Sequence, residues 1–135
     1  MHLIFKDYYL KHKPLLSSTP KSKLEVKITS ELAKILGGRT EVQCAYGLGR
    51  IDILSHEWLI EAKYSGSTNE KNALGQLIVY SEAMNWRYNR GLAIIGTGYP
   101  IPGIRKFCRD KGITIFFYNL NCCRWLLLDD NREKQ

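Results

Sequence analysis

The stretch GRIDILSHEWLIEAK, residues 49–63, decides the fold of this chain. It contains two short runs rich in branched apolar residues, at 51–54 and 58–60, which the polar residues 55–57 separate. Short apolar runs on either side of a polar break are typical of two paired strands joined by a tight turn. The stretch therefore predicts a β-hairpin.

Three charged residues, Asp52, Glu61 and Lys63, interrupt the apolar runs of this hairpin. Side chains alternate between the faces of a strand, so Glu61 and Lys63 should share one face. Ile60 and Ala62 should then share the other. A turn centred on the polar break would also bring Asp52 beside Glu61. The pattern predicts two carboxylates and an ammonium group close together in an apolar setting.

Such a cluster needs a compensating interaction, because an unpaired charge in a site of low dielectric costs several kcal/mol. Two adjacent carboxylates also repel each other, which raises the pKa of one of them. A divalent cation would relieve both effects, and Mg²⁺ prefers hard oxygen ligands such as carboxylates. Asp52 and Glu61 are therefore candidate metal ligands. Lys63 would lie beside the metal, where it could orient an attacking water or offset charge on a phosphate.

Asp52 followed by the triplet Glu61, Ala62 and Lys63 resembles the signature of the PD-(D/E)XK nucleases. The triplet alone is short, and three longer strings carry the resemblance: GRIDIL at 49–54, WLIEAK at 58–63 and ALGQLIVY at 73–80. The similar region covers residues 24–95. Ile51 stands where the proline in the family's name would be, which is a departure from the pattern.

The resemblance implies a site with further members. In these nucleases a glutamate of the first helix often completes the metal site, and Glu25 matches that position by its distance from the glycine pair that ends the helix. Glu31, on the other side of the apolar stripe, is the rival candidate. The carbonyl of Ala62 would assist the metal, and Gln76 of the second helix would support the site. The implied cofactor is Mg²⁺, with Mn²⁺ as a substitute.

The formal net charge of +7 suits a polyanionic partner but says nothing about fold. Residues 1–23 form a basic N-terminal segment in which lysines such as Lys11 and Lys13 alternate with aromatic residues. We expect this segment and Arg50, just before the hairpin, to contact nucleic acid. Tyr80, one helical turn after the glutamine of the second helix, is a further candidate. The alternatives are that the N-terminal segment packs against the core, that Arg50 forms an ion pair at the end of a strand, and that Tyr80 is a core residue.

The chain has four cysteines, and none forms a CxxC pair that would indicate a zinc site. We interpret them as reduced thiols of a cytoplasmic protein. No stretch approaches the roughly 20 apolar residues that a membrane-spanning helix needs. The three histidines show no metal-ligand spacing, and the glycine pairs lack the context of a phosphate-binding loop.

We expect a single α/β domain over residues 1–135, with 129–135 as a polar tail. Apolar spacing predicts helices at 22–36, 70–88 and 100–111. The expected strands are 39–46, the two arms of the hairpin, 91–96 and 113–118, with 124–128 as an optional last strand. The order α-β-β-β-α-β-α-β describes a mixed sheet flanked by helices. It agrees with the restriction-endonuclease-like core of the resembled family.

The residues predict the site, and the resemblance implies its activity: a Mg²⁺-dependent endonuclease that hydrolyses DNA, with RNA left open as a substrate. A structure-selective enzyme, or a catalytic module in a larger complex, fits the small size of the domain. The alternative is a DNA-binding protein that keeps the fold without cleaving. A homodimer would let two sites cut both strands symmetrically.

Overall fold

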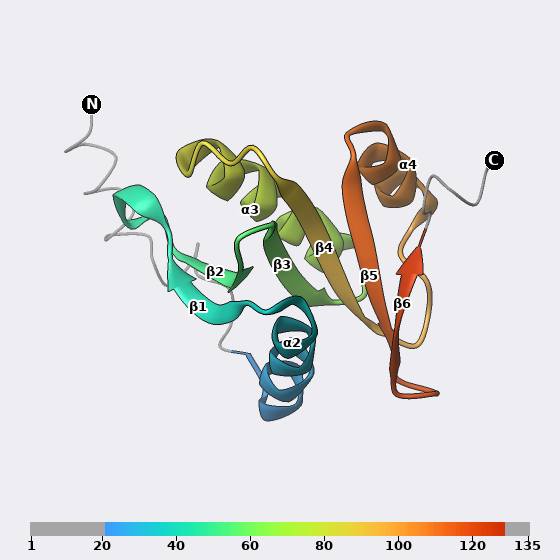
Figure 1. Ribbon diagram of the computed structural model, residues 1–135. Helices are drawn as coiled ribbons and strands as arrows, with labels where there is room; N and C mark the ends of the chain where they lie inside the picture. Colours follow the sequence, from blue (N-terminus) through green and yellow to red (C-terminus); the bar gives the residue numbers. More distant parts are fainter. Residues whose placement is uncertain (1–20, 129–135) are drawn as a thin grey trace.

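The computed structural model describes residues 21–128, and these residues form one six-stranded sheet with helices on both faces (Figure 1). The elements in chain order are α2 (Lys23–Leu36), β1 (Arg39–Gln43), a 3₁₀ turn η1 (Ala45–Gly47), β2 (Arg50–Leu54), β3 (Trp58–Tyr64), α3 (Ser67–Ala83), β4 (Asn89–Gly96), α4 (Pro102–Asp110), β5 (Ile113–Asn119) and β6 (Arg124–Leu128). The strands lie in the sheet in the order in which they occur in the chain.

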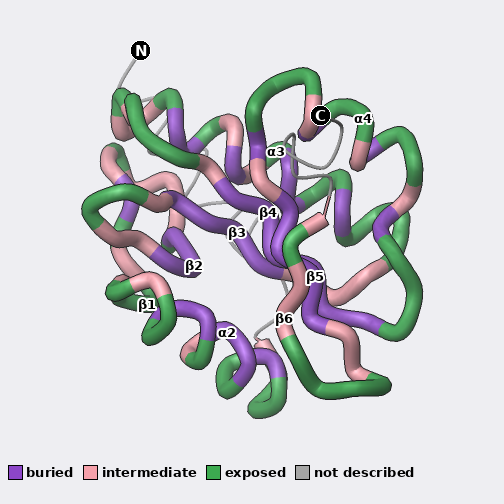
Figure 2. Tube along the Cα trace, turned by 45° about the vertical axis from the view of Figure 1, so that its right-hand side comes forward, coloured by how far each residue is buried: buried purple, intermediate pink, exposed green. Residues whose placement is uncertain are grey.

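The sheet is mixed, as expected for an α/β domain of this element order. Strands β3, β4 and β5 run parallel and are joined by the crossover helices α3 and α4, whereas β1, β2 and β6 pair antiparallel at the two sides. Parallel strands need such crossovers and are covered on both faces. Figure 2 shows that the three central strands are buried along most of their length, as this cover on both faces requires.

Two apolar layers hold the helices to the sheet. On one face, Leu32 and Ala33 of α2 pack against Ile60 and Ala62 of β3. On the other face, residues of α3 and α4 pack against alternate positions of the same strands, Leu59 among them. The predicted alternation along β3 is therefore confirmed.

The first helix is confirmed, and local signals set both of its ends. Ser22 is the N-cap, and its hydroxyl oxygen accepts a hydrogen bond from the backbone N–H of Glu25. Gly37 ends the helix in the left-handed conformation (φ 68°). Glycine adopts this conformation without steric cost, which is why it commonly ends helices.

The second helix differs from the predicted 70–88 at both ends. It begins at Ser67, because the carboxylate of Glu70 is buried and accepts hydrogen bonds from the backbone N–H of Gly66 and of Ile101. It ends at Ala83, where Asn85 takes a positive φ of 50° and turns the chain away. The helix is therefore shifted toward the amino terminus.

Smaller differences concern the strands and the third helix. The predicted strand 39–46 stops at Gln43 and continues as the turn η1, in which Tyr46 has a positive φ of 62°. The third helix is shorter than 100–111, with Pro102 in its first turn, where the missing N–H costs nothing. The optional last strand exists as β6, so the element order gains one strand.

All four cysteines are free, with Cys44 and Cys108 buried and Cys122 and Cys123 exposed. Between residues 21 and 128 no helix combines the length and the apolar character that crossing a membrane requires.

Candidate functional site

Strands β2 and β3 separate at the two carboxylates of the hairpin. Regular pairing ends at Ile53 and Ile60. At the next position the backbone N–H of Asp52 donates to Oε2 of Glu61 (2.9 Å). In the same way, the N–H of Ala62 donates to Oδ2 of Asp52 (2.7 Å). Side-chain oxygens thus take the place of the carbonyls that a continued ladder would supply to these two N–H groups.

We call the place where β2 and β3 separate, at Asp52 and Glu61, the fork. At the fork the side chains of β2 also change the face of the sheet on which they pack. Ile53 packs in the layer under α2, whereas Ile51, two residues earlier, packs in the layer under α3. Regular alternation would keep both on one face. The two isoleucines flank Asp52, whose carboxylate accepts a hydrogen bond from the backbone N–H of Ala62 on β3. Opposite Asp52 on β1, Glu41 has a positive φ of 56°. The sequence predicted that Asp52 and Glu61 lie close together, and the geometry brings them together.

A third group, Lys21, lies among these oxygens. Its ammonium nitrogen is 2.7 Å from the carbonyl oxygen of Ala62, 2.9 Å from Oε2 of Glu25 and 3.4 Å from Oδ2 of Asp52. These are three of the four oxygen donors that the sequence assigns to a metal ion. The geometry shows that one cation can contact all three at once.

The start of α2 positions Glu25 for this contact. The helix begins immediately after Ser22, so Glu25 lies in its first turn, and α2 packs against β1, β2 and β3. Glu25 is buried, with only 6% of the residue exposed, whereas its rival Glu31 is exposed. A carboxylate in the first turn is also favoured by the helix dipole. Of the two glutamates, the structure brings Glu25 to the cluster.

Burial and mutual repulsion shift the pKa values of the buried carboxylates. Burial raises the pKa of Glu61 well above its ordinary 4.5, and the charge of Asp52 raises it further. Burial also raises the pKa of Asp52, although Lys21 acts against it. For Lys21 burial lowers the pKa, but the charges of Asp52, Glu25 and Glu61 outweigh this effect and hold the pKa above its ordinary 10.5.

Lys63 follows Glu61 on the same face of β3 and is half-buried. Burial lowers its pKa, and so does the neighbouring charge of Lys21, while the charges of Asp52, Glu25 and Glu61 act in the opposite direction. Its ammonium is therefore within electrostatic range of the whole cluster. Within residues 21–128, no carboxylate lies within 4 Å of Lys63 to form an ion pair.

The other predicted site residues are less closely connected to the cluster. Gln76 is half-buried on α3, which packs against β3, but within the described chain no hydrogen bond joins it to the carboxylates. Tyr80 is 6% exposed and packs in the layer under α3, with its hydroxyl against Gly49, so the interpretation as a core residue accounts for it. Arg50 is exposed and 3.9 Å from Glu41, a pair of little energetic weight. Lys11 and Lys13 lie outside the described residues.

Sequence reasoning missed the role of Lys21, which it counted only among the charges of the basic segment. One signal was present, since Lys21 and Glu25 are four residues apart and that spacing allows a pair at the start of a helix. The contact with Ala62, 41 residues away, left no local trace in the sequence.

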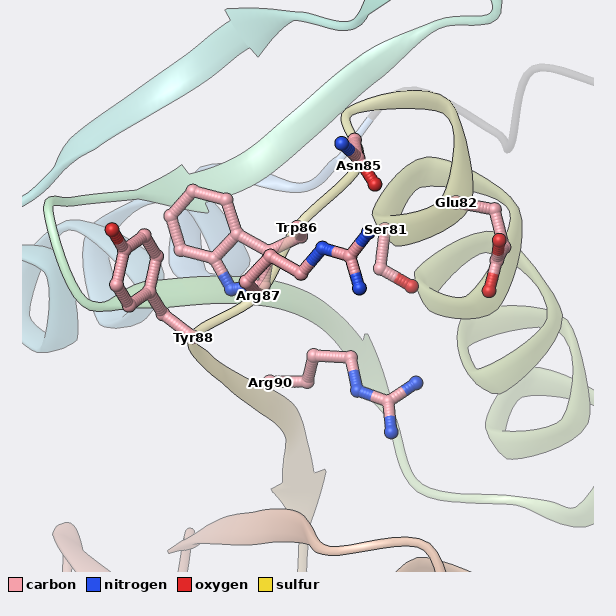
Figure 3. Close-up of a pocket in the computed structure, with 7 residues that line it drawn as sticks. All are labelled: Ser81, Glu82, Asn85, Trp86, Arg87, Tyr88 and Arg90. Carbon is pink, nitrogen blue, oxygen red and sulfur yellow. The ribbon is translucent and has the colours of Figure 1, made fainter.

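A separate hollow of about 360 Å³ lies at the other end of the sheet. Residues from the end of α3, the following connection and the start of β4 line it. Figure 3 shows the rings of Trp86 and Tyr88 beside each other, with the guanidinium groups of Arg87 and Arg90 between them and α3. Because β4 begins next to Trp58, at the opposite end of β3 from Lys63, this hollow is not part of the carboxylate cluster.

The oxygens of the cluster surround the ammonium group of Lys21. Among residues 21–128, no three His, Cys, Asp or Glu side chains are gathered as a ready metal-binding group. The donors that the fork and α2 provide are nevertheless hard oxygens, the type that Mg²⁺ prefers. By ligand type these residues fit that ion.

The raised pKa of Glu61 predicts how the stability of the metal-free protein depends on pH. A folded-state pKa above the ordinary 4.5 of the unfolded chain means that the folded protein binds more protons. The contribution of Glu61 is then fully present below that unfolded pKa and is lost as pH rises through the folded pKa. Urea unfolding in EDTA from pH 4.5 to 7.5 should show wild type losing stability relative to Glu61→Gln. A pH-independent difference would contradict the buried, shifted carboxylate.

Comparison of the chain with protein-family models, with curated proteins and with solved structures finds no match.

Proposed function

We propose that this protein is a metal-dependent nuclease of the PD-(D/E)XK type, which hydrolyses phosphodiester bonds of DNA. The observation that carries the proposal is the convergence of oxygens from Glu25, Asp52 and Ala62 on one cation, with Glu61 and Lys63 beside them. Glu25, Asp52 and Glu61 are each buried, and a protein seldom buries carboxylates in one part of its fold without a function for them, because each buried charge costs stability.

Asp52, Glu61, Glu25 and the carbonyl of Ala62 would hold Mg²⁺ or Mn²⁺. The bound ion would supply Lewis-acid stabilisation of negative charge on the scissile phosphate. Lys63, on the same strand face as Glu61, would orient the attacking water and stabilise charge that develops in the transition state. The apolar layers on both sides of β3 keep the positions of these groups fixed. Gln76 and Arg50 are proposed as supporting contacts, to the site and to a phosphate respectively.

The experiment that tests this function is a cleavage assay on single-stranded, duplex, flapped and four-way DNA, with RNA of the same sequences alongside. We expect cleavage in Mg²⁺ or Mn²⁺ and none in EDTA. Light scattering of the free protein and of its DNA complex would show whether two copies act together, as symmetric cutting of two strands suggests. If no nucleic acid is cut with either metal, the protein is not a nuclease.

DNA binding without cleavage is a second candidate, and a different observation favours it. The hollow near the start of β4 combines the exposed side chains of Arg87 and Tyr88 with the half-buried Trp86 and Arg90, and such aromatic and guanidinium groups suit contacts with bases and phosphates. The same assay separates the two functions. Salt-dependent binding with no cleavage in either metal would support this second candidate.

A further inference from the structure

The ammonium of Lys21 lies where the proposed metal ion would lie. It contacts oxygens of three separate elements: Glu25 on α2, Asp52 on β2 and Ala62 on β3. We propose that Lys21 is a further residue of this site, which holds the cation position in the metal-free protein and is displaced when a divalent ion binds. The inference rests on the proposed function, because it takes these oxygens to be the metal ligands.

The donor geometry of Lys21 supports this role. An ammonium group has three N–H donors and no acceptor, and the three contacts of Lys21 at 2.7, 2.9 and 3.4 Å match that capacity. Its side chain is only 12% exposed, although lysine side chains usually keep their ammonium in water. Mg²⁺ binds oxygen ligands at about 2.0–2.1 Å. Two cations that share the same oxygens would lie within a few ångström of each other, so the ammonium and the metal exclude each other.

The composition of the cluster agrees with this exchange. Three acidic residues, Glu25, Asp52 and Glu61, lie near two lysines, Lys21 and Lys63. A divalent ion in place of the Lys21 ammonium brings one more positive charge to these acidic residues.

The chain can make this exchange without unfolding its first helix. Lys21 precedes the N-cap residue Ser22, and the cap hydrogen bond to Glu25 does not involve the lysine side chain. Rotation of the Lys21 side chain would leave this cap hydrogen bond in place. The cost of losing its three contacts should appear as a weaker apparent affinity for the metal.

Calorimetric titration with Ca²⁺ compares wild type with Lys21→Met, which keeps most of the length of the side chain and removes its charge. We expect Lys21→Met to bind Ca²⁺ at least about 10-fold more tightly, because no competing cation has to leave. Lys23→Met is the matched control, since Lys23 is exposed on the first turn of α2 and carries the same charge. It should change the affinity by no more than about 2-fold.

A second measurement uses the wild-type protein and detects the displacement itself. Acetylation of lysine amines, followed by mass spectrometry, should be slow at Lys21 in EDTA and faster when Ca²⁺ is bound. Labelling of Lys23 should not depend on Ca²⁺. Because this measurement needs no substitution at Lys21, it holds even if Lys21→Met folds poorly.

The outcomes separate this inference from the proposed function. The role of Lys21 is overturned if wild type and Lys21→Met bind Ca²⁺ with equal affinity. It is also overturned if the rate of Lys21 labelling does not depend on Ca²⁺. Either outcome leaves the metal site in place. Failure of both proteins to bind Ca²⁺ overturns the metal site and the Lys21 inference with it. Tighter binding together with faster labelling supports the displacement.

Discussion

Asp52→Asn and Glu61→Gln should each reduce metal-dependent cleavage to background, a loss of at least about 10³-fold. Removal of one preorganised electrostatic group costs roughly 10²–10³-fold, and each substitution removes a ligand charge as well. The amide oxygens of Asn and Gln can still accept the backbone hydrogen bonds from Ala62 and Asp52 that bridge the fork. The loss should therefore come from the site and not from the fold.

The measurement is single-turnover cleavage with circular dichroism and thermal unfolding of the same samples. Glu57→Gln is the matched control, because Glu57 is an exposed carboxylate in the turn of the same hairpin. This variant should cleave at the wild-type rate. Metal-free Glu61→Gln should be more stable than wild type near neutral pH, since a buried carboxylate with a raised pKa is lost. Wild-type cleavage by either site variant would show that these carboxylates do not hold the metal.

The parts of the fold that the sequence predicted correctly depend on neighbours in the chain. The hairpin follows from two apolar runs and a polar break, and its pairing places Leu54 opposite Leu59 as the turn demands. The first helix begins after Ser22 and ends at Gly37, and both residues act through hydrogen bonds or backbone conformation within a few positions. Local patterns are sufficient for such elements.

The start of the second helix could not be predicted from local sequence patterns. Periodicity alone placed its start at Glu70, three residues too late, because the cap involves the N–H of Ile101, 31 residues further along the chain. A buried glutamate that ties two loops together looks like any other charged residue of a first helical turn. Only the packing of α3 beside the loop before α4 distinguishes it.

The candidate site also has features that the sequence predicts and features that it does not. The distance between Asp52 and Glu61 across one turn predicted that the two residues are neighbours. The fork itself could not be predicted, because side-chain oxygens there replace ladder carbonyls and the alternation of β2 is broken. The position of Lys21 was equally hidden, since its contact with Ala62 depends on how α2 docks against β3.

Lys63→Ala should lower single-turnover cleavage by roughly 10²–10³-fold, the cost of removing one preorganised electrostatic group. Lys63 lies on the face of Glu61, is half-buried and has a carboxylate cluster within electrostatic range. In the described chain no ion pair fixes its ammonium, so the group remains available to a substrate phosphate. Charge on the phosphate grows in the transition state, and the loss should therefore fall on turnover more than on binding.

The affinity for DNA, measured in Ca²⁺, should change little in Lys63→Ala, and so should the affinity for Ca²⁺ itself. Lys63→Arg should restore activity only in part, because a planar guanidinium cannot reproduce a compact point charge in a half-buried position. Lys71→Ala is the control for loss of one positive charge, since Lys71 is exposed on α3. If Lys63→Ala cleaves as fast as Lys71→Ala, the lysine of β3 has no part in the reaction, and the carboxylates with their metal carry it alone.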